Sequence, residues 1–218
     1  MKLKKIASLA LAGVMAISML AGCSGKTENN ENNGDQNQVV AASVADYANS
    51  LLSSAQKNVF EFENSSDLTA ALKKVASDST KFGSTDIKAI SDNLTSLALS
   101  QLVNSDLASE LKDEMKLDVE AGNGLNSVAK EGDRTQGFVY AVSGKLTEAS
   151  AVQLVVKGFA DAAMKNNSYF PATVGTEYKC DYTAEISAVK VTAPDTDKNS
   201  AWVVAIVVTQ DAVKVSNT

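Results

Sequence analysis

The chain has 218 residues, with 20 Lys and Arg against 26 Asp and Glu, which gives a formal net charge of −6. It contains no histidine, so Ser-His-Asp and Cys-His catalysis, histidine-bearing zinc sites and imidazole acid–base chemistry are all excluded. Its two cysteines are Cys23 and Cys180.

The N-terminal segment has the pattern of an export signal. Lys2, Lys4 and Lys5 precede an apolar run from Ile6 to Leu20. At 1.5 Å per residue this run makes a helix of roughly 22 Å. Such a helix is shorter than the ~30 Å hydrocarbon core, so the run fits the apolar region of a signal peptide better than a permanent membrane span.

The apolar run ends in Leu20-Ala21-Gly22-Cys23, which resembles the lipobox of bacterial lipoproteins. The resemblance implies a diacylglycerol on the Cys23 sulfur and cleavage after Gly22, so that residues 1–22 are a signal peptide. It also implies attachment to the membrane through the lipid. The alternative is an ordinary secretory signal in which Cys23 has no special role.

Residues 23–38 are expected to be the lipidated cysteine and a disordered tether. The segment is rich in asparagine and charged residues and has no large apolar residue, so it cannot bury enough surface to offset its ordering entropy. About 15 residues reach some 20 Å. A polar tether of this kind resembles those of lipoproteins from Gram-positive bacteria, which places the protein at the outer face of the cell membrane.

Cleavage after Gly22 removes three lysines and no acids, so the mature chain carries a net charge of about −9. Nucleic-acid phosphates and anionic headgroups repel such a chain, and neither is expected as a direct partner. Two kinds of partner are expected: the membrane, through the lipid on Cys23, and a cell-envelope protein or a wall component.

Residues 39–218 are expected to form a single α+β domain. Its N-terminal half has apolar residues at three- and four-residue spacings, which predict helices. Ser65-Ser66-Asp67 and Gly83-Ser84 supply helix starts, and Asn104-Ser105 interrupts the pattern. The predicted helical stripes span 40–59, 68–76, 87–102 and 107–115.

The second half predicts a β-α-β-β order with an antiparallel sheet. After an expected loop at 119–135 come a strand at 138–142 and a helix capped by Thr147. A strand around Cys180 and another at 202–208 should form a hairpin, with the last strand central. The apolar residues of the first strand change from even to odd positions, which predicts a β-bulge near 187–189.

Cys180 has no intramolecular disulfide partner once Cys23 is lipidated. It alternates with Tyr178 and Tyr182 on one face of the predicted strand, which indicates a small buried side chain. The alternative is a reactive or dimer-forming thiol.

Two motifs suggest chemistry without histidine. Ser54-Ala55-Gln56-Lys57 and Ser91-Asp92-Asn93 match two motifs of penicillin-recognising enzymes, whose third motif, K-T-G, is missing. Two further S-x-x-K matches, at 127–130 and 187–190, show that chance explains this pattern.

Asp195, Asp197 and Asn199 resemble the start of a calcium-binding loop. However, Ser200 occupies the position of the required glycine and Ile206 that of the glutamate, and a plain hairpin turn explains the same residues. We therefore expect no catalytic residues and no cofactor, with these three residues as a weak metal candidate.

These features predict a non-enzymatic binding or structural module at the cell surface. The alternatives are a histidine-independent hydrolase or enzyme accessory that uses Ser/Lys or carboxylate chemistry, and the solute-binding component of an importer.

Overall fold

The computed structural model describes residues 43–92, 102–118, 125–126, 131–165, 169–194 and 198–215. All of them belong to one unit, Val40–Thr218. The predicted signal peptide, Cys23 and the tether lie outside these residues. Within the described ranges, no helix combines the length and apolarity needed to cross a membrane.

A mixed sheet of five strands lies at the centre of this unit, which is α+β as predicted. Its main order is β1-β4-β5-β2, and β3 pairs with the beginning of β4. The pairs β2·β5, β3·β4 and β4·β5 are antiparallel, as expected for the second half, whereas β1 of the N-terminal half, which was not predicted, runs parallel to β4. The strands are β1 (Phe62–Asn64), β2 (Gly132–Ser143), β3 (Thr173–Val174), β4 (Tyr178–Thr192) and β5 (Ser200–Lys214).

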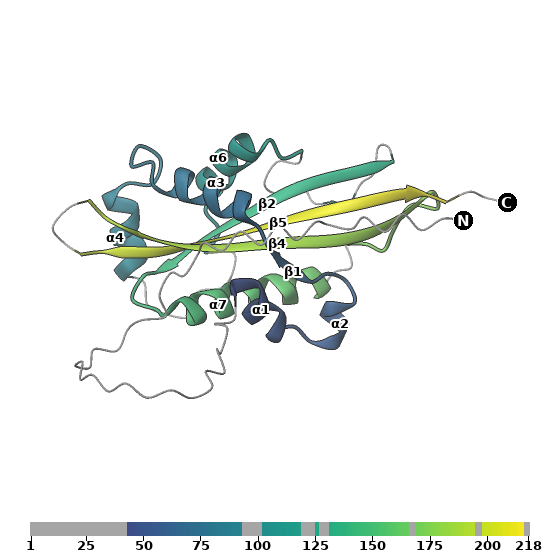
Figure 1. The fold of residues 1–218 in the computed structure, drawn as a ribbon, viewed down its shortest axis with the longest axis horizontal. Coiled ribbons are helices and arrows are strands. Elements are labelled where there is room, and N and C mark those ends of the chain that lie inside the picture. The colour runs from purple at the N-terminus through teal and green to yellow at the C-terminus, as the bar shows by residue number, and fades with distance from the viewer. Residues whose placement is uncertain are drawn as a thin grey trace, which may run out of the picture. The chain divides into compact units, whose positions relative to one another are not determined.

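Helices cover both faces of the sheet (Figure 1). The α7 face carries α1 (Val44–Ser50), α2 (Ser54–Lys57) and α7 (Glu148–Lys165). The α3 face carries α3 (Ser66–Ala76), α4 (Ser84–Asp92) and α6 (Ser105–Met115). Because strand residues alternate between faces, even-numbered residues of β2, β4 and β5 point to the α7 face and odd-numbered ones to the α3 face.

Polar caps define where several helices begin. The side chains of Ser65, Asn104 and Thr147 accept hydrogen bonds from backbone N–H groups of the first turns of α3, α6 and α7, at 3.0 to 3.1 Å. These caps satisfy N–H groups that have no partner within the helix. The caps at Ser65 and Thr147 confirm the helix starts expected from the sequence, and the expected interruption at Asn104 is the start of α6.

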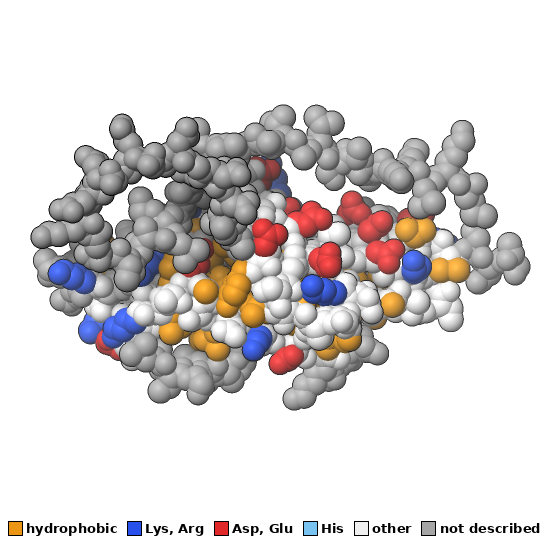
Figure 2. Space-filling view, turned by 60° about the horizontal axis from the view of Figure 1, so that its bottom comes forward, with side chains coloured by type: hydrophobic (Ala, Val, Ile, Leu, Met, Phe, Trp, Pro, Cys, Tyr) orange, Lys and Arg blue, Asp and Glu red, His pale blue; other side chains and the backbone are white. Residues whose placement is uncertain are grey.

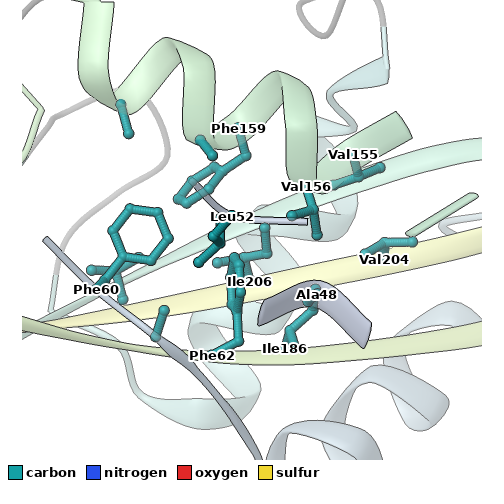
Figure 3. Close-up of a cluster of buried hydrophobic side chains, with 14 of the residues drawn as sticks. Ala48, Leu52, Phe60, Phe62, Val155, Val156, Phe159, Ile186, Val204 and Ile206 are labelled. Atoms are coloured by element: carbon teal, nitrogen blue, oxygen red, sulfur yellow. The ribbon is translucent and has the colours of Figure 1, made fainter. Parts of the chain in front are cut away.

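The core on the α7 face is aromatic. Phe60 contacts Phe62 and Phe159 edge-on, with ring centroids 5.4 and 5.7 Å apart. Figure 3 shows side chains from α7 and from the strands interleaved around these rings. Phe170 extends the cluster to Tyr182, whose ring centroid lies 5.3 Å away. This packing fixes the α7 face of the sheet.

The helical stripe predicted at 40–59 is divided into two short helices. Ser53 and Gln56 form a capping box, in which the Ser53 side chain accepts from the Gln56 N–H and the Gln56 side chain accepts from the Ser53 N–H. This local arrangement starts α2 anew after α1. α1 places Ala45 and Ala48 in the α7-face core, whereas α2 has no buried residue and the core contacts come from its neighbours Leu52 and Phe60.

The predicted β-bulge near 187–189 is wrong. β4 pairs with β5 without interruption from Tyr178↔Lys214 to Thr192↔Ser200. The apolar positions change from even to odd because the α7 face of β4 is buried near its beginning and the α3 face is buried near its end. Cys180 and Tyr182 belong to the α7-face core, whereas Val189 packs against the α3-face core.

The strands are longer than their apolar runs. β5 continues to Lys214, well past the expected end at Val208, and it is central as predicted, between β4 and β2. β2 begins at Gly132, within the segment expected to be a loop. These extensions carry polar residues on one face, and they create the surface described below.

Candidate functional site

Among the residues that the structure describes, no helix lies over part of the α3 face of the sheet. The helical layer ends near a row formed by Gly137, Val207 and Glu185. A Cβ on Gly137 would meet Leu117 Cδ1 at 2.8 Å, which shows how closely the segment after α6 approaches here. One row further into the covered region, Ser187 Oγ lies 2.9 Å from Thr69 Oγ1 of α3. In the opposite direction the strands continue with exposed and half-buried residues.

Two polar rows cross the uncovered strands. Asp133 of β2 pairs with Asp211 of β5, which pairs in turn with Asp181 of β4. The next row consists of Thr135, Thr209 and Thr183, aligned in the same way. We call these six residues and Glu185 the acidic strand surface. Figure 2 shows a group of Asp and Glu side chains on one face of the molecule.

The three aspartates are exposed and carry like charges on directly opposed positions. Residues directly opposite on antiparallel strands have Cβ atoms about 4.5–5.5 Å apart, and like charges there are destabilising. Lys179 Nζ lies 3.5 Å from Asp181 Oδ2, but both side chains are mostly exposed, at 65% and 74%. Such a pair contributes little, so the row stays negatively charged.

Glu185 adds a half-buried carboxyl at the inner end of the surface. Burial raises its pKa, and the nearby charges of Asp67 and Glu63 raise it further, against a hydrogen bond from Ser65 that lowers it. Like charges therefore lie close together where the acidic strand surface meets the start of α3.

The outer edge of β2 beside this surface is occupied. The Asp118 carboxylate accepts hydrogen bonds from the Thr135 N–H and from Thr135 Oγ1, both at 3.1 Å. Further along the strand, the Val139 carbonyl accepts from the Asn104 N–H at 2.9 Å. These contacts use backbone groups that would otherwise invite another strand. The open feature is therefore the face of the sheet.

The reverse side of the same strands is a buried polar cluster. Gln210 Nε2 donates to the Leu125 carbonyl at 2.5 Å and to the Tyr182 hydroxyl at 3.0 Å. The Tyr182 hydroxyl donates to the Pro171 carbonyl at 2.8 Å. Cys180 is only 3% exposed, which confirms the expected buried thiol, and burial raises its pKa. A protonated, enclosed thiol is a poor nucleophile.

A concave feature lies between α3 and α6. It is an open groove of about 230 Å³ whose walls are mostly charged. Ion pairs join Lys74 to Glu114 at 2.6 Å and Lys81 to Glu110 at 2.7 Å. The groove is lined by Lys74, Val75, Asp78, Glu110, Asp113 and Glu114. Pairing within the chain already satisfies part of its charge.

The residues of the weak calcium candidate are only partly within the described ranges. Asp195 and Asp197 lie outside them, and Asn199 is buried, with its carbonyl accepting from the Ala193 N–H at 2.9 Å. In the described part of the chain, no three or more Cys, Asp or Glu side chains form a group that could hold a metal ion. The calcium loop therefore remains a prediction.

The two motifs of penicillin-recognising enzymes are not brought together. Ser54 and Lys57 lie on α2 at the α7 face, whereas Ser91 lies on α4 at the α3 face. Ser91 is 1% exposed, and its carbonyl accepts a hydrogen bond from the Ser143 hydroxyl at 3.0 Å. The sheet separates these serines, so they cannot form one catalytic site.

Our sequence analysis missed the acidic strand surface. Its signal was present as polar residues at alternate positions, in Asp181-x-Thr183-x-Glu185, Thr209-x-Asp211 and Asp133-x-Thr135. Such alternation is typical of a strand with one solvated face. The alignment of the three segments depends on the register of the sheet, which the sequence does not state.

Comparisons with known protein families, with curated proteins and with solved structures find no match for this chain. The function is therefore argued from the residues and their geometry alone.

Proposed function

We propose that this chain is a lipid-anchored, non-enzymatic binding module at the outer face of the cell membrane of a Gram-positive bacterium. Cys23 would carry the lipid, residues 24–38 would form the tether, and the α+β unit would be the binding head. The observation that supports binding most directly is the uncovered part of the α3 face. A sheet face is normally covered or solvated by scattered polar groups, whereas here one aligned row of three aspartates has no described helix over it.

The shape of the head also favours binding through a surface. The groove between α3 and α6 is open and lined by ion-paired side chains. Small-molecule sites are usually enclosed and mostly apolar. A broad, polar sheet face instead fits a macromolecular partner in the cell envelope, and a tether of about 20 Å would let the head reach one near the membrane.

The anchor is tested by replacing the two cysteines separately in the full chain. We expect Cys23→Ser to abolish incorporation of radiolabelled palmitate and to release the protein from the membrane fraction. Cys180→Ser is the matched control, because Cys180 is buried in the core and should leave labelling unchanged. Labelling that persists in Cys23→Ser would contradict the proposal.

A further inference from the structure

We propose that the acidic strand surface binds a cationic protein partner, one that presents Lys and Arg side chains from an extended segment. This inference rests on the proposed function, because it names the partner class of the binding head. The partner would bind on the uncovered part of the α3 face, and the negative charge of this face favours a positively charged partner.

The geometry of the sheet face defines what fits. The described helices of the α3 face end beside the row of Gly137, Val207 and Glu185, and the strands extend beyond them. The two rows beyond consist of Asp and Thr, and the exposed pair Lys179 and Val213 follows them, so most of the face is polar and an apolar helix would not be a suitable cover. A polar, extended segment can lie flat on such a face, because strand residues stand roughly perpendicular to the sheet.

The spacing of the carboxylates matches a repeated cation. Opposed residues across Asp133, Asp211 and Asp181 are about 5 Å apart, so the row spans about 10 Å. Side chains on one face of an extended peptide recur every 6.6–6.8 Å or so, which allows two basic residues to contact one row. In the threonine row beside it, the Thr135 hydroxyl is already bonded to Asp118, and the hydroxyls of Thr183 and Thr209 can accept hydrogen bonds from ammonium or guanidinium groups.

Charge complementarity decides between occupants. The three aspartates repel one another in the free protein, and a polycation would relieve that repulsion. Nucleic acids and anionic headgroups would add to it. A chelated metal ion is also disfavoured, since the described side chains include no group suited to hold one. A Lys- and Arg-bearing polypeptide is the occupant that remains.

The test uses the full chain and a synthetic probe, a fluorescent twelve-residue peptide of alternating Lys and Thr. The test variant is Asp133→Asn/Asp181→Asn/Asp211→Asn. The matched control is Glu110→Gln/Asp113→Asn/Glu114→Gln in the α3–α6 groove, which changes the net charge by the same amount. Binding is measured by fluorescence anisotropy at low salt and at about 0.15 M salt, where the screening length is about 8 Å.

We expect the unmodified chain to bind the Lys-Thr peptide and not a Glu-Thr peptide. The aspartate variant should bind it about tenfold or more weakly, whereas the groove variant should change the affinity less than about threefold. Raising the salt should weaken binding by the unmodified chain and have less effect on the aspartate variant. Thermal melting should show that the aspartate variant is at least as stable, because repulsion has been removed.

A second variant, Thr183→Lys, places a positive charge on the exposed part of the surface with the aspartates intact, and it should also weaken binding. Equal losses in the aspartate and groove variants would show that only net charge matters and would overturn the proposal. So would no binding by the unmodified chain. Neither result would affect the anchor, which palmitate labelling of Cys23 tests separately.

Discussion

Single buried polar residues hold the end of the sheet behind the acidic strand surface. Tyr182 links two parts of the chain, because its hydroxyl donates to Pro171 and accepts from Gln210. Gln210 is fully buried, and its Nε2 also donates to the Leu125 carbonyl. Removing one partner of such a group leaves the others desolvated and unsatisfied.

Tyr182→Phe should therefore lower the free energy of unfolding by about 1–2 kcal/mol, with the fold retained. The expected control is Tyr169→Phe, since Tyr169 is 41% exposed and should change stability little. Urea denaturation of both variants measures the difference. Equal effects at the two tyrosines would show that the Tyr182 hydrogen bonds carry no particular weight.

Glu185 makes stability depend on pH in a defined direction. Its folded-state pKa is raised, chiefly by burial, so the folded state favours the protonated carboxyl more than the unfolded state does. This contribution is fully present below the ordinary value of about 4.5 and is lost as the pH rises through the raised pKa.

Glu185→Gln should consequently raise the melting temperature at pH 7, because the variant avoids a partly buried charge near Glu63 and Asp67. The gain should be on the order of 1 kcal/mol or less and should vanish below about pH 4, where Glu185 is itself neutral. Glu177→Gln, at an exposed position, serves as the control. A gain that is the same at both pH values would contradict the assignment.

At the scale of elements, the helices were the more predictable part. Ser65 and Thr147 cap α3 and α7 as the sequence indicates, and Asn104, expected only to interrupt the helical pattern, caps α6. A cap is predictable because it depends only on residues a few positions away. β1 and β3 are short and were not predicted. β1 pairs with residues of β4 that lie more than a hundred positions away in the sequence, and β3 is only two residues long.

The cap of α6 gives a test at this scale. The Asn104 side chain accepts from the Leu107 N–H at 3.0 Å, while its own backbone N–H donates to Val139. Asn104→Ala removes the first contact and keeps the second, so it should lower stability by about 1 kcal/mol. Asn104→Asp should retain most of it. Chemical denaturation that gives the same loss for both variants would argue against the cap.

The whole described unit is a sheet buried unequally on its two faces. On the α7 face the core extends as far as Cys180 and Ala212, whereas on the α3 face no described helix covers the strand residues from Thr183 to Asp181. Apolar residues on alternating faces produced the false bulge prediction, because a strand buried on different faces along its length imitates a change of register. The acidic strand surface could not be predicted for a related reason: Asp133, Asp181 and Asp211 meet only once β2, β4 and β5 are aligned.

The account centres on a tethered head that binds a cationic partner through the acidic strand surface. Site-specific photo-crosslinking in intact cells tests it most directly, with a photoreactive residue in place of Thr183 or, as a control, of exposed Asp113. We predict an adduct with a basic, extracytoplasmic protein from position 183 only, lost when Asp133, Asp181 and Asp211 are changed to Asn. Equal adducts from both positions, or an adduct insensitive to the aspartates, would contradict the account.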